Sequence, residues 1–224
     1  MVLENELLND PSANGFFCQT TSYRFETRPD PNRHCLQFAM AEFEIHGGLE
    51  ELIQFEREML EHFGFGKANS FPEVDYLQIC AKYGVEELDH THEARLTKEY
   101  GPVVFLKNFS ESTSPFFNMR RVDAKDPETG DTVRVARKCD VIMNGVETIG
   151  SAERSTNPTE MRESFFSIMK GEYSKALFEK FGKERVMKEL DEFLAHKFII
   201  RSGAGIGVTR MIAACKAAGL IKHN

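Results

Sequence analysis

The sequence predicts an α+β protein in which an antiparallel β-sheet is flanked by helices. Two strand pairs carry this prediction, one in residues 16–45 and one around Asn144-Gly145, together with helical periodicity in the segments between and after them. Strand pairs with separate runs of helix are typical of α+β domains. The 224 residues provide for one large domain with at most a small appendage.

The first strand pair consists of residues 16–26, which are aromatic and threonine-rich, and residues 34–45. In the second segment Ala39, Ala41, Phe43 and Ile45 share one face by strand alternation, opposite Phe38, Met40, Glu42 and Glu44. Residues 28–32, with two prolines, form the turn or loop between the strands.

Helices are expected at 49–63 and 75–84, where apolar residues recur at helical spacing and a glycine follows. Residues 102–109 have the apolar run of a buried strand, and residues 126–131 form a turn. From about 159 to 197 the pattern indicates two helical stretches that are broken near Gly182. A short strand at 198–200 and a closing helix after Gly207 complete the chain.

Residues 133–150 form the second strand pair, because Asn-Gly is a strong signal for a two-residue hairpin turn. Such a turn pairs Met143 with Val146 and Ile142 with Glu147, and it places Asp140 opposite Ile149. The carboxylates of Asp140 and Glu147 then converge on one side of the hairpin. Two facing acids are costly unless a cation joins them, and Mg²⁺ favours two carboxylates plus phosphate oxygens. The alternative is a pair of solvated acids on an exposed hairpin.

The stretch RSGAGIGVTRM (201–211) has glycines at every second position and then Arg210. A Walker loop would need Gly-Lys-Ser/Thr, and a dinucleotide fingerprint would need GxGxxG with a second strand after it, so neither motif fits. A tight strand-to-helix turn remains the purely structural interpretation. Residues 89–93 (DHTHE) are interpreted as a helix start rather than as a metal site.

Composition excludes several classes of protein. No run of about 18 apolar residues is present, which argues against a membrane span. The acidic first ten residues do not form a secretory signal, and five scattered cysteines indicate reduced thiols, so we expect a cytoplasmic protein. The net charge of −7 argues against DNA or other general nucleic-acid binding.

Four segments occur in one fixed order: YRFE (23–26), RHCLQF (33–38), DVIMNGVETIGSAER (140–154) and GAGIGVTR (203–210). Together they resemble the catalytic core of class II aminoacyl-tRNA synthetases, in the aspartate/asparagine/lysine branch that includes ammonia-dependent asparagine synthetase. The resemblance covers about residues 16–215. It places the second family motif at about 23–45 and the third at about 198–215, within a catalytic domain from 16 to 224 that follows an extension at 1–15.

The resemblance implies roles for individual residues in ATP-dependent formation of an aminoacyl adenylate. Arg24 matches the arginine on the α-phosphate and substrate carboxylate, and Arg210 matches the arginine on the γ-phosphate; both would be catalytic. A guanidinium suits these roles because its planar fork binds phosphate oxygens in pairs. Glu26 matches the acid beside adenine and Phe38 the ring on which adenine stacks. The remaining ATP-binding residues implied are Arg33, His34, Gly205 and Gly207.

The same resemblance makes Asp140 and Glu147 the Mg²⁺ ligands. It places Glu42 near the amino group of the substrate and Arg154 at its side chain. An arginine there favours an aspartate-like substrate, with asparagine second, because a charge-assisted bidentate bond to carboxylate is the stronger one.

The sequence also departs from the family pattern. Gln37 stands where the family usually has glutamate, and the first family motif has no room before residue 16, so the chain is expected to be truncated at its N-terminus relative to the family. We therefore expect a stand-alone AMP-forming ligase that uses ATP and Mg²⁺, is a homodimer, and passes the activated group to ammonia or tRNA. The alternatives are the catalytic part of an aspartyl- or asparaginyl-tRNA synthetase and a non-catalytic paralogue.

Overall fold

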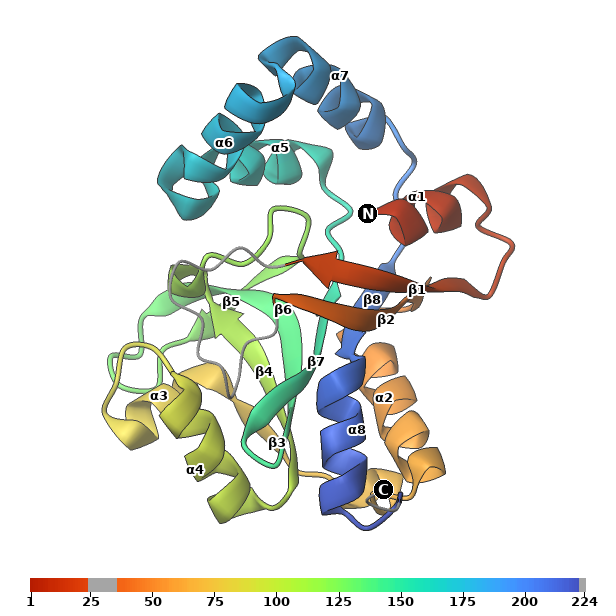
Figure 1. Ribbon diagram of the computed structural model, residues 1–224. Coiled ribbons are helices and arrows are strands. Elements are labelled where there is room, and N and C mark those ends of the chain that lie inside the picture. Colours follow the sequence, from red (N-terminus) through yellow and green to blue (C-terminus); the bar gives the residue numbers. More distant parts are fainter. Residues whose placement is uncertain (24–35, 222–224) are drawn as a thin grey trace.

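The computed structural model describes residues 1–23 and 36–221. Its centre is an eight-stranded sheet in the order β1-β2-β8-β7-β6-β4-β3, with β5 paired to β6 (Figure 1). Neighbouring strands are antiparallel except for β3 and β4, which are parallel. The α+β prediction is therefore confirmed. The strands are β1 (Gly15–Tyr23), β2 (Gln37–His46), β3 (Glu73–Asp75), β4 (Val103–Ser110), β5 (Arg121–Lys125), β6 (Thr132–Met143), β7 (Val146–Glu153) and β8 (Arg201–Gly207).

The helices form three groups, two of which cover the sheet (Figure 1). Helices α2 (Leu49–Phe63) and α8 (Val208–Ala217) pack on one face, where Leu52, Val141, Ile149 and Ile206 belong to the largest apolar cluster. Helices α3 (Tyr76–Tyr83) and α4 (His90–Tyr100) cover β4 and β6 through a second cluster around Tyr76. The third group comprises α5 (Pro158–Ser167), α6 (Glu172–Phe181) and α7 (Lys183–Leu194), and the N-terminal helix is α1 (Val2–Asn9).

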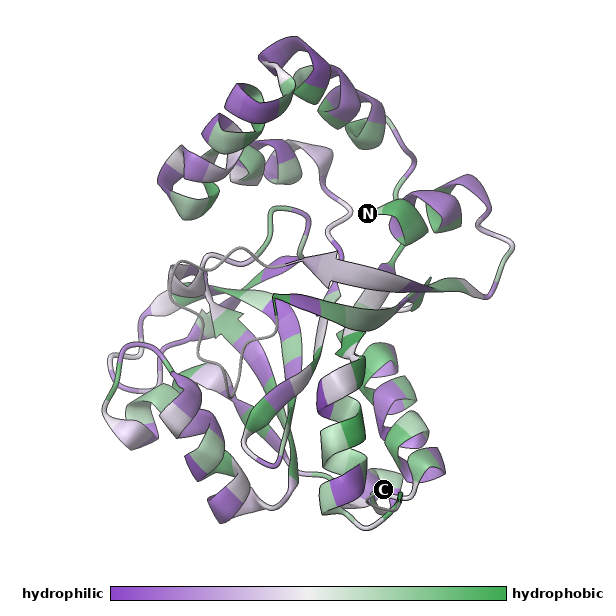
Figure 2. Cartoon of the chain, in the orientation of Figure 1, coloured by the Kyte–Doolittle hydropathy of each residue, from purple (hydrophilic) through white to green (hydrophobic). Residues whose placement is uncertain are grey.

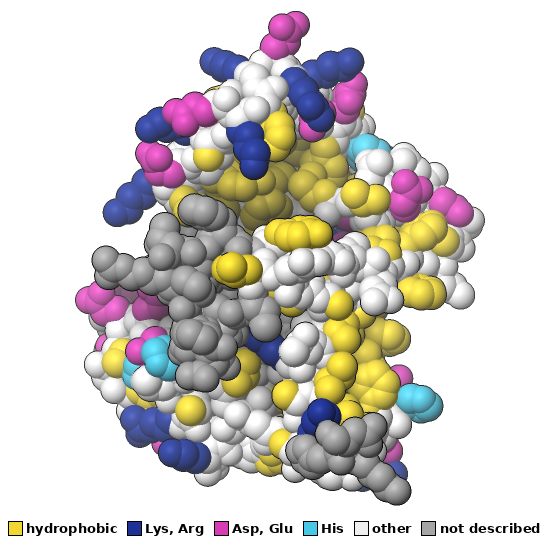
Figure 3. Space-filling view, in the orientation of Figure 1, with side chains coloured by type: hydrophobic (Ala, Val, Ile, Leu, Met, Phe, Trp, Pro, Cys, Tyr) yellow, Lys and Arg dark blue, Asp and Glu magenta, His cyan; other side chains and the backbone are white. Residues whose placement is uncertain are grey.

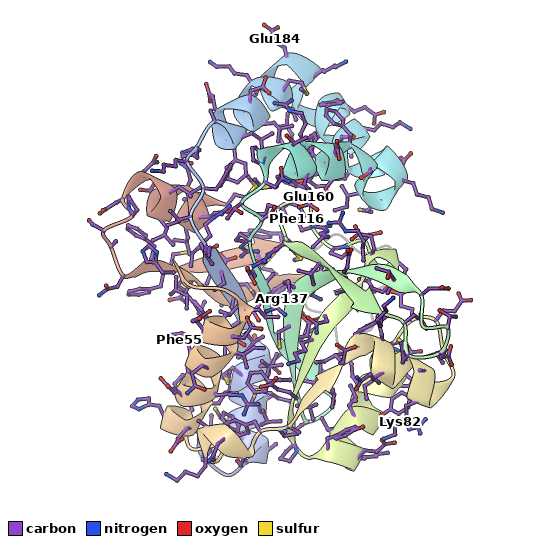
Figure 4. The ribbon with its side chains drawn as sticks, turned by 180° about the vertical axis from the view of Figure 1, so that it is seen from behind. Phe55, Lys82, Phe116, Arg137, Glu160 and Glu184 are labelled. Atoms are coloured by element: carbon purple, nitrogen blue, oxygen red, sulfur yellow. The ribbon has the colours of Figure 1, made fainter. Side chains whose placement is uncertain are left out.

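The third group stands apart from the other two and has its own apolar cluster around Phe117, Met161 and Phe193. Its outer surface is largely hydrophilic, as Figure 2 shows along α6 and α7. Charged side chains point outward there, whereas hydrophobic side chains gather in the hollow that faces the sheet (Figure 3). Viewed from behind, Phe116 and Glu160 lie between α5 and the sheet, and Glu184 lies at the far tip of α7 (Figure 4).

Most elements expected from the sequence are present. The structure confirms the two strand pairs, the helix at 49–63, the helix before Gly84 and the closing helix. The first two of these helices, α2 and α3, end on Gly64 and Gly84, which are in the left-handed conformation. Residues 24–26, 34 and 35 of the expected first strand pair, and its turn at 28–32, lie outside the described residues. Asp89 caps the start of α4 by accepting hydrogen bonds from the backbone N–H groups of Thr91 and His92, as residues 89–93 suggested.

Three expectations at the C-terminal side were wrong in detail. The region 159–197 holds three helices instead of two, because the chain also turns at Met169 and Lys170, where φ is 52° and 56°. Residues 198–200 are not a strand, and the strand begins at Arg201. The glycines at 203, 205 and 207 therefore lie within β8 and do not form a turn.

None of the helices that the structure describes is both long and apolar enough to cross a bilayer.

A buried carboxyl group in α2 has an unusual setting. Glu56 is fully buried against the sheet, and neither of its side-chain oxygens has a hydrogen-bond partner among the described residues. Burial raises the pKa of Glu56 to about 8, and the Ser151 hydroxyl beside it offsets only part of that rise. That hydroxyl donates its own hydrogen bond to the carbonyl of Cys139.

We predict that Glu56 makes the protein less stable as pH rises from about 5 to 8. The folded state keeps the proton up to about pH 8, whereas the unfolded state releases it near the ordinary glutamate pKa of 4.5. The free energy of unfolding should therefore fall by up to about 1.4 kcal/mol per pH unit in this window and level off above it. Glu56→Gln should remove this slope and be the more stable protein at pH 8, as measured by urea unfolding at several pH values.

Glu58→Gln provides the control, because Glu58 lies exposed on the same helix. It should retain the wild-type slope. A Glu56→Gln protein with an unchanged slope would show that Glu56 is ionised in the folded state at neutral pH.

Candidate functional site

One face of the sheet carries a cavity of about 580 Å³. It lies over β2, β7 and β8, with α8 along one side. Four predicted ATP-binding residues line it, namely Phe38, Gly205, Gly207 and Arg210, together with the predicted metal ligand Glu147. The other lining residues are Ser22, Met40, Met143, Asn144, Val146, Thr148, Gly150, Thr209, Ala213, Ala214 and Ala217. The predicted residues Arg24, Glu26, Arg33 and His34 lie outside the described part of the chain.

The floor of the cavity is flat because glycines pair across it. Gly150 of β7 lies opposite Gly205 of β8, which in turn lies opposite Glu42 of β2. A Cβ on Gly205 would approach the Met40 methyl group to 2.7 Å, and one on Gly150 would approach Glu147 Oε1 to 2.9 Å. The alternating glycines of the third motif therefore keep side chains off the floor, and this need for space explains their spacing.

Arg210 lies on the first turns of α8, at the edge of this floor. Its Nη1 donates a 2.6 Å hydrogen bond to the backbone carbonyl of Glu147. This bond ties α8 to the β6–β7 hairpin and fixes the guanidinium beside the cavity. Phe38 lies across the floor at the start of β2, so the cavity has an aromatic ring and a guanidinium on its walls.

The acidic hairpin forms with a different register from the one expected. Met143 pairs with Val146 and Ile142 with Glu147, as predicted, but a bulge follows and Asp140 pairs with Gly150. The expected pairing of Asp140 with Ile149 was therefore wrong, because one extra residue lies in β7.

The two acids nevertheless meet on the cavity face. Asp140 Oδ1 and Glu147 Oε1 lie 3.6 Å and 2.9 Å from the position that a Cβ on Gly150 would take. Asp140 is 5% exposed, and its Oδ1 has no hydrogen-bond partner among the described residues. Its other oxygen, Oδ2, accepts a 2.6 Å hydrogen bond from Lys138 Nζ.

The protonation of Asp140 depends on burial and on two charged neighbours, Lys138 and Glu147. Burial raises the pKa of Asp140 to about 7, Lys138 opposes that rise, and the Glu147 carboxylate adds to it. A cation between the two carboxylates would stabilise both ionised forms. Among the described residues no three Asp, Glu, His or Cys side chains gather as a complete metal cage. Two converging carboxylate oxygens, of which Asp140 Oδ1 has no donor among the described residues, fit a Mg²⁺ ion that takes its other ligands from phosphate and water.

The predicted amino-acid-binding residues lie farther along the same face, outside the cavity lining. Arg154 donates two hydrogen bonds to Glu44, from Nε to Oε1 at 3.0 Å and from Nη2 to Oε2 at 3.1 Å. Glu42 accepts a 2.9 Å hydrogen bond from the Thr20 hydroxyl, and the Cys18 thiol lies 3.9 Å from the same oxygen. Burial lowers the pKa of Arg154, but its acidic neighbours outweigh burial, so the net shift is upward.

Four charged residues of this face had no role in the sequence-based prediction. Strand alternation had already placed Glu44 on one face with Glu42, and it could have placed Lys138 with Asp140, two residues away on the same strand. Arg201 and Glu4 form a buried ion pair, with Nε to Oε1 at 2.9 Å. Nothing in the sequence indicates that pair, because its members are almost 200 residues apart.

The arrangement can hold a polyanion at one end and a small zwitterion at the other. A ring, a guanidinium and a pair of acids surround a flat glycine floor at the cavity. Arg154, Glu44 and Glu42 supply both signs of charge for an amino acid farther along. Such a face can orient a carboxylate towards a phosphate, which is the main requirement of adenylation.

Comparison with known families agrees with this geometry. Residues 12–223 match the family model described as tRNA synthetases class II (D, K and N). No curated protein sequence matches the chain significantly.

Similar solved structures have the same fold. Asparaginyl-tRNA synthetase from Pyrococcus horikoshii complexed with asparaginyl-adenylate has a TM-score of 0.67 at 19% identity, over 95% of this chain and 51% of its own. Aspartyl-tRNA synthetase from Entamoeba histolytica has a TM-score of 0.68 at 15% identity, over 95% and 47%. The asparaginyl-tRNA synthetase of Entamoeba histolytica in complex with asparaginyl-adenylate has a TM-score of 0.64 at 20% identity. The match covers 94% of this chain and 51% of that protein. The chain thus spans about half the length of these proteins.

We predict that Gly203→Ala breaks the pair between Glu44 and Arg154. Its Cβ would lie 1.9 Å from Glu44 Oε2 and 2.6 Å from the Phe43 carbonyl, so both a side chain and the backbone of β2 must move. The melting temperature should fall by several degrees, because overpacking of this kind costs about 1–3 kcal/mol.

Gly207→Ala on the same strand is the matched control. Its Cβ would make only ordinary contacts, at 3.5 Å and beyond, and Gly207 has no positive φ. A Gly203→Ala protein as stable as Gly207→Ala would contradict the tight packing of β8 against Glu44.

Proposed function

The chain belongs to the class II tRNA synthetases of the D, K and N group, and from this premise we propose that it activates the carboxylate of aspartate or asparagine with ATP. The product is an aminoacyl adenylate, and pyrophosphate leaves. The observation that carries the proposal is the cavity, which brings Phe38, Glu147 and Arg210 from three distant segments around one glycine floor. Two of the similar structures contain asparaginyl-adenylate, which is the same class of product.

In this proposal the adenine ring stacks on Phe38, and the triphosphate extends along the glycine floor towards Arg210. Backbone without side chains allows a close approach of the nucleotide, and a guanidinium meets phosphate oxygens in pairs. Arg24 contacts the α-phosphate and Glu26 the adenine, as the family resemblance implies, and Arg33 and His34 complete the ATP site. The protein thereby neutralises charge that develops as the α-phosphate is attacked.

Asp140 and Glu147 hold Mg²⁺ with the triphosphate in this proposal. The support is the convergence of Asp140 Oδ1 and Glu147 Oε1, where the first of these has no hydrogen-bond partner. When bound, the ion would draw charge from the phosphate oxygens. The two side chains fix its position from a rigid hairpin whose turn residues Asn144 and Gly145 both have positive φ.

The amino acid lies beside Arg154, with Glu42 at its amino group. Sequence reasoning favoured aspartate over asparagine because of the charge on Arg154. In the structure Glu44 binds Nε and Nη2 and neutralises that charge, which weakens the preference for a carboxylate over an amide. Aspartate and asparagine are therefore both substrates in this proposal, with neither preferred. Amino acids whose side chains have no hydrogen-bond acceptor are rejected.

The acceptor of the activated group is ammonia in the main form of the proposal, which makes the protein a stand-alone ligase related to asparagine synthetase. We also include a homodimer, on the family resemblance alone. The four cysteines described, namely Cys18, Cys80, Cys139 and Cys215, are free thiols, which supports placement in the reducing cytoplasm.

A second candidate is the catalytic part of an aspartyl- or asparaginyl-tRNA synthetase, with tRNA as acceptor. The observation that favours it is coverage, since the chain matches about half of each similar synthetase. Pyrophosphate exchange with each amino acid, followed by trapping of the adenylate with ammonia or with tRNA, separates the two candidates. A protein without exchange for any of the twenty amino acids would instead be a non-catalytic paralogue.

We predict that Arg210→Ala and Arg24→Ala each slow amino-acid-dependent ATP–pyrophosphate exchange by about a hundredfold or more. Each change removes a donor that meets developing phosphate charge, and one such donor contributes about 3 kcal/mol. The control is Arg185→Ala, because Arg185 lies exposed on α7, where it pairs with Glu189 and lies over the Phe181 ring. Near-normal exchange in either site variant would overturn the role given to that arginine.

We further predict that Glu44→Gln shifts the substrate preference towards aspartate. Removing the counter-charge leaves Arg154 with a net positive charge, which favours a carboxylate over an amide by about tenfold in kcat/KM. Exchange assays with aspartate, asparagine and lysine would measure the shift. A shift towards asparagine, or preferred activation of lysine, would contradict the assignment of Arg154 to the substrate side chain.

A further inference from the structure

Lys138 lies on the sheet face that carries the cavity, although it was not among the site residues expected from the sequence. It precedes Asp140 by two residues on β6, so both side chains project from the same face of the sheet. Its Nζ donates to Asp140 Oδ2 at 2.6 Å and lies 3.9 Å from the centre of the Phe109 ring. The side chain is 24% exposed, so the ammonium is largely enclosed between a carboxylate and an aromatic face.

The ammonium has a partner on each side. The Asp140 carboxylate lies 2.6 Å from Nζ and balances its charge. The aromatic face adds a favourable cation–π contact. Lys138 is thus a positive charge held at the acidic hairpin.

The two oxygens of Asp140 are used differently. Oδ2 is occupied by Lys138, whereas Oδ1 is buried without a hydrogen-bond partner and points towards the side of the hairpin where Glu147 Oε1 lies. A divalent ion that bound Oδ1 would therefore lie close to the ammonium. Two cations that share one carboxylate repel each other strongly in a partly buried site.

The remaining charges near Asp140 come from two other elements. Glu147 of β7 and Glu93 of α4 both act on it as negative charges. Glu93 Oε2 also accepts a hydrogen bond from the backbone N–H of Glu147, at 3.3 Å. Asp140, Glu147 and Glu93 therefore gather near one lysine, beside the part of the cavity that Glu147 lines, and without Lys138 these acids would repel a triphosphate.

We infer that Lys138 is a tethered cation of the nucleotide site, which supplies part of the positive charge for the triphosphate from within the chain and weakens metal binding at Asp140. The inference rests on the proposed function in taking ATP as the ligand and Asp140 as a metal ligand. Two consequences of opposite sign follow. Loss of the ammonium should weaken the binding of metal-free ATP, and it should strengthen the binding of a divalent ion alone.

The test compares wild-type protein with Lys138→Met, which keeps the aliphatic stem and removes the charge. Binding of Mn²⁺ in the absence of nucleotide is measured by electron paramagnetic resonance of the free ion. Binding of ATP in excess EDTA is measured by calorimetry. We expect Mn²⁺ to bind Lys138→Met about tenfold more tightly and metal-free ATP to bind it about fivefold more weakly.

Two further lysine variants separate charge from structure. Lys138→Arg should bind both ligands as the wild type does, because it keeps the charge. Lys107→Met is the matched control, since Lys107 lies on the neighbouring strand β4 and pairs with Glu73. It should leave both affinities unchanged, and circular dichroism of each variant checks the fold.

The outcomes separate this inference from the proposed function. If Lys138→Met weakened both ligands or left both unchanged, Lys138 would be a structural residue and the inference would be overturned. If Asp140→Asn bound Mn²⁺ as tightly as the wild type, the metal assignment in the proposed function would fail. The affinity of Lys138→Met for metal-free ATP would then still decide whether Lys138 serves the nucleotide.

Discussion

The fold depends on one buried ion pair, between Arg201 at the start of β8 and Glu4 of α1. Arg201 is fully buried, and Glu4 is 2% exposed. The guanidinium also donates to the carbonyls of Ser155 and Ile199, and Glu4 accepts a further bond from Asn118. An unpaired charge in this position would cost several kcal/mol. The pair therefore joins the N-terminal helix, the segment after β7 and strand β8. It also lies next to Arg154, whose backbone N–H donates a hydrogen bond to the Arg201 carbonyl.

The two faces of the sheet carry different kinds of side chain around β7 and β8. On one face Val141, Ile149 and Ile206 pack against α2 and α8 as an ordinary apolar core, which also encloses the carboxyl of Glu56. On the other face the strands present glycines and charged side chains, because neighbouring glycines leave room for Glu44 and for a ligand. The face that packs against α2 and α8 stabilises the sheet, and the face with the cavity remains available for a ligand. Binding sites are commonly carried by such a rigid scaffold.

Charges on the open face are paired in advance. On this face Arg154 is held by Glu44 and Asp140 by Lys138. On the face covered by α2, Glu153 accepts a hydrogen bond from the backbone N–H of Leu49 at the start of that helix. Glu153 also binds Arg137, seen near the middle of the sheet in Figure 4. Pairing fixes each side chain before a ligand arrives, and such preorganisation reduces the reorganisation that catalysis would otherwise require. It also means that the charge a ligand meets differs from the charge of any single residue.

The sequence by itself determined the α+β class and most of the strands and helices, because strand alternation, helical spacing and turn residues are local signals. The family resemblance, and no local signal, pointed to Phe38, Gly205, Gly207, Arg210 and Glu147, which line the cavity. The sequence placed Asp140 and Glu147 on one face even though a bulge in β7, between Glu147 and Ile149, shifted their register. Only the tertiary structure decided that Gly203 and Gly205 make space within a strand, since the neighbours that need this space, Glu44 and Met40, come from β2. The same holds for Arg201 with Glu4 and for Arg154 with Glu44. These partners are far apart in the chain. Their charges have to be paired because they are buried, and no local sequence pattern indicates that burial.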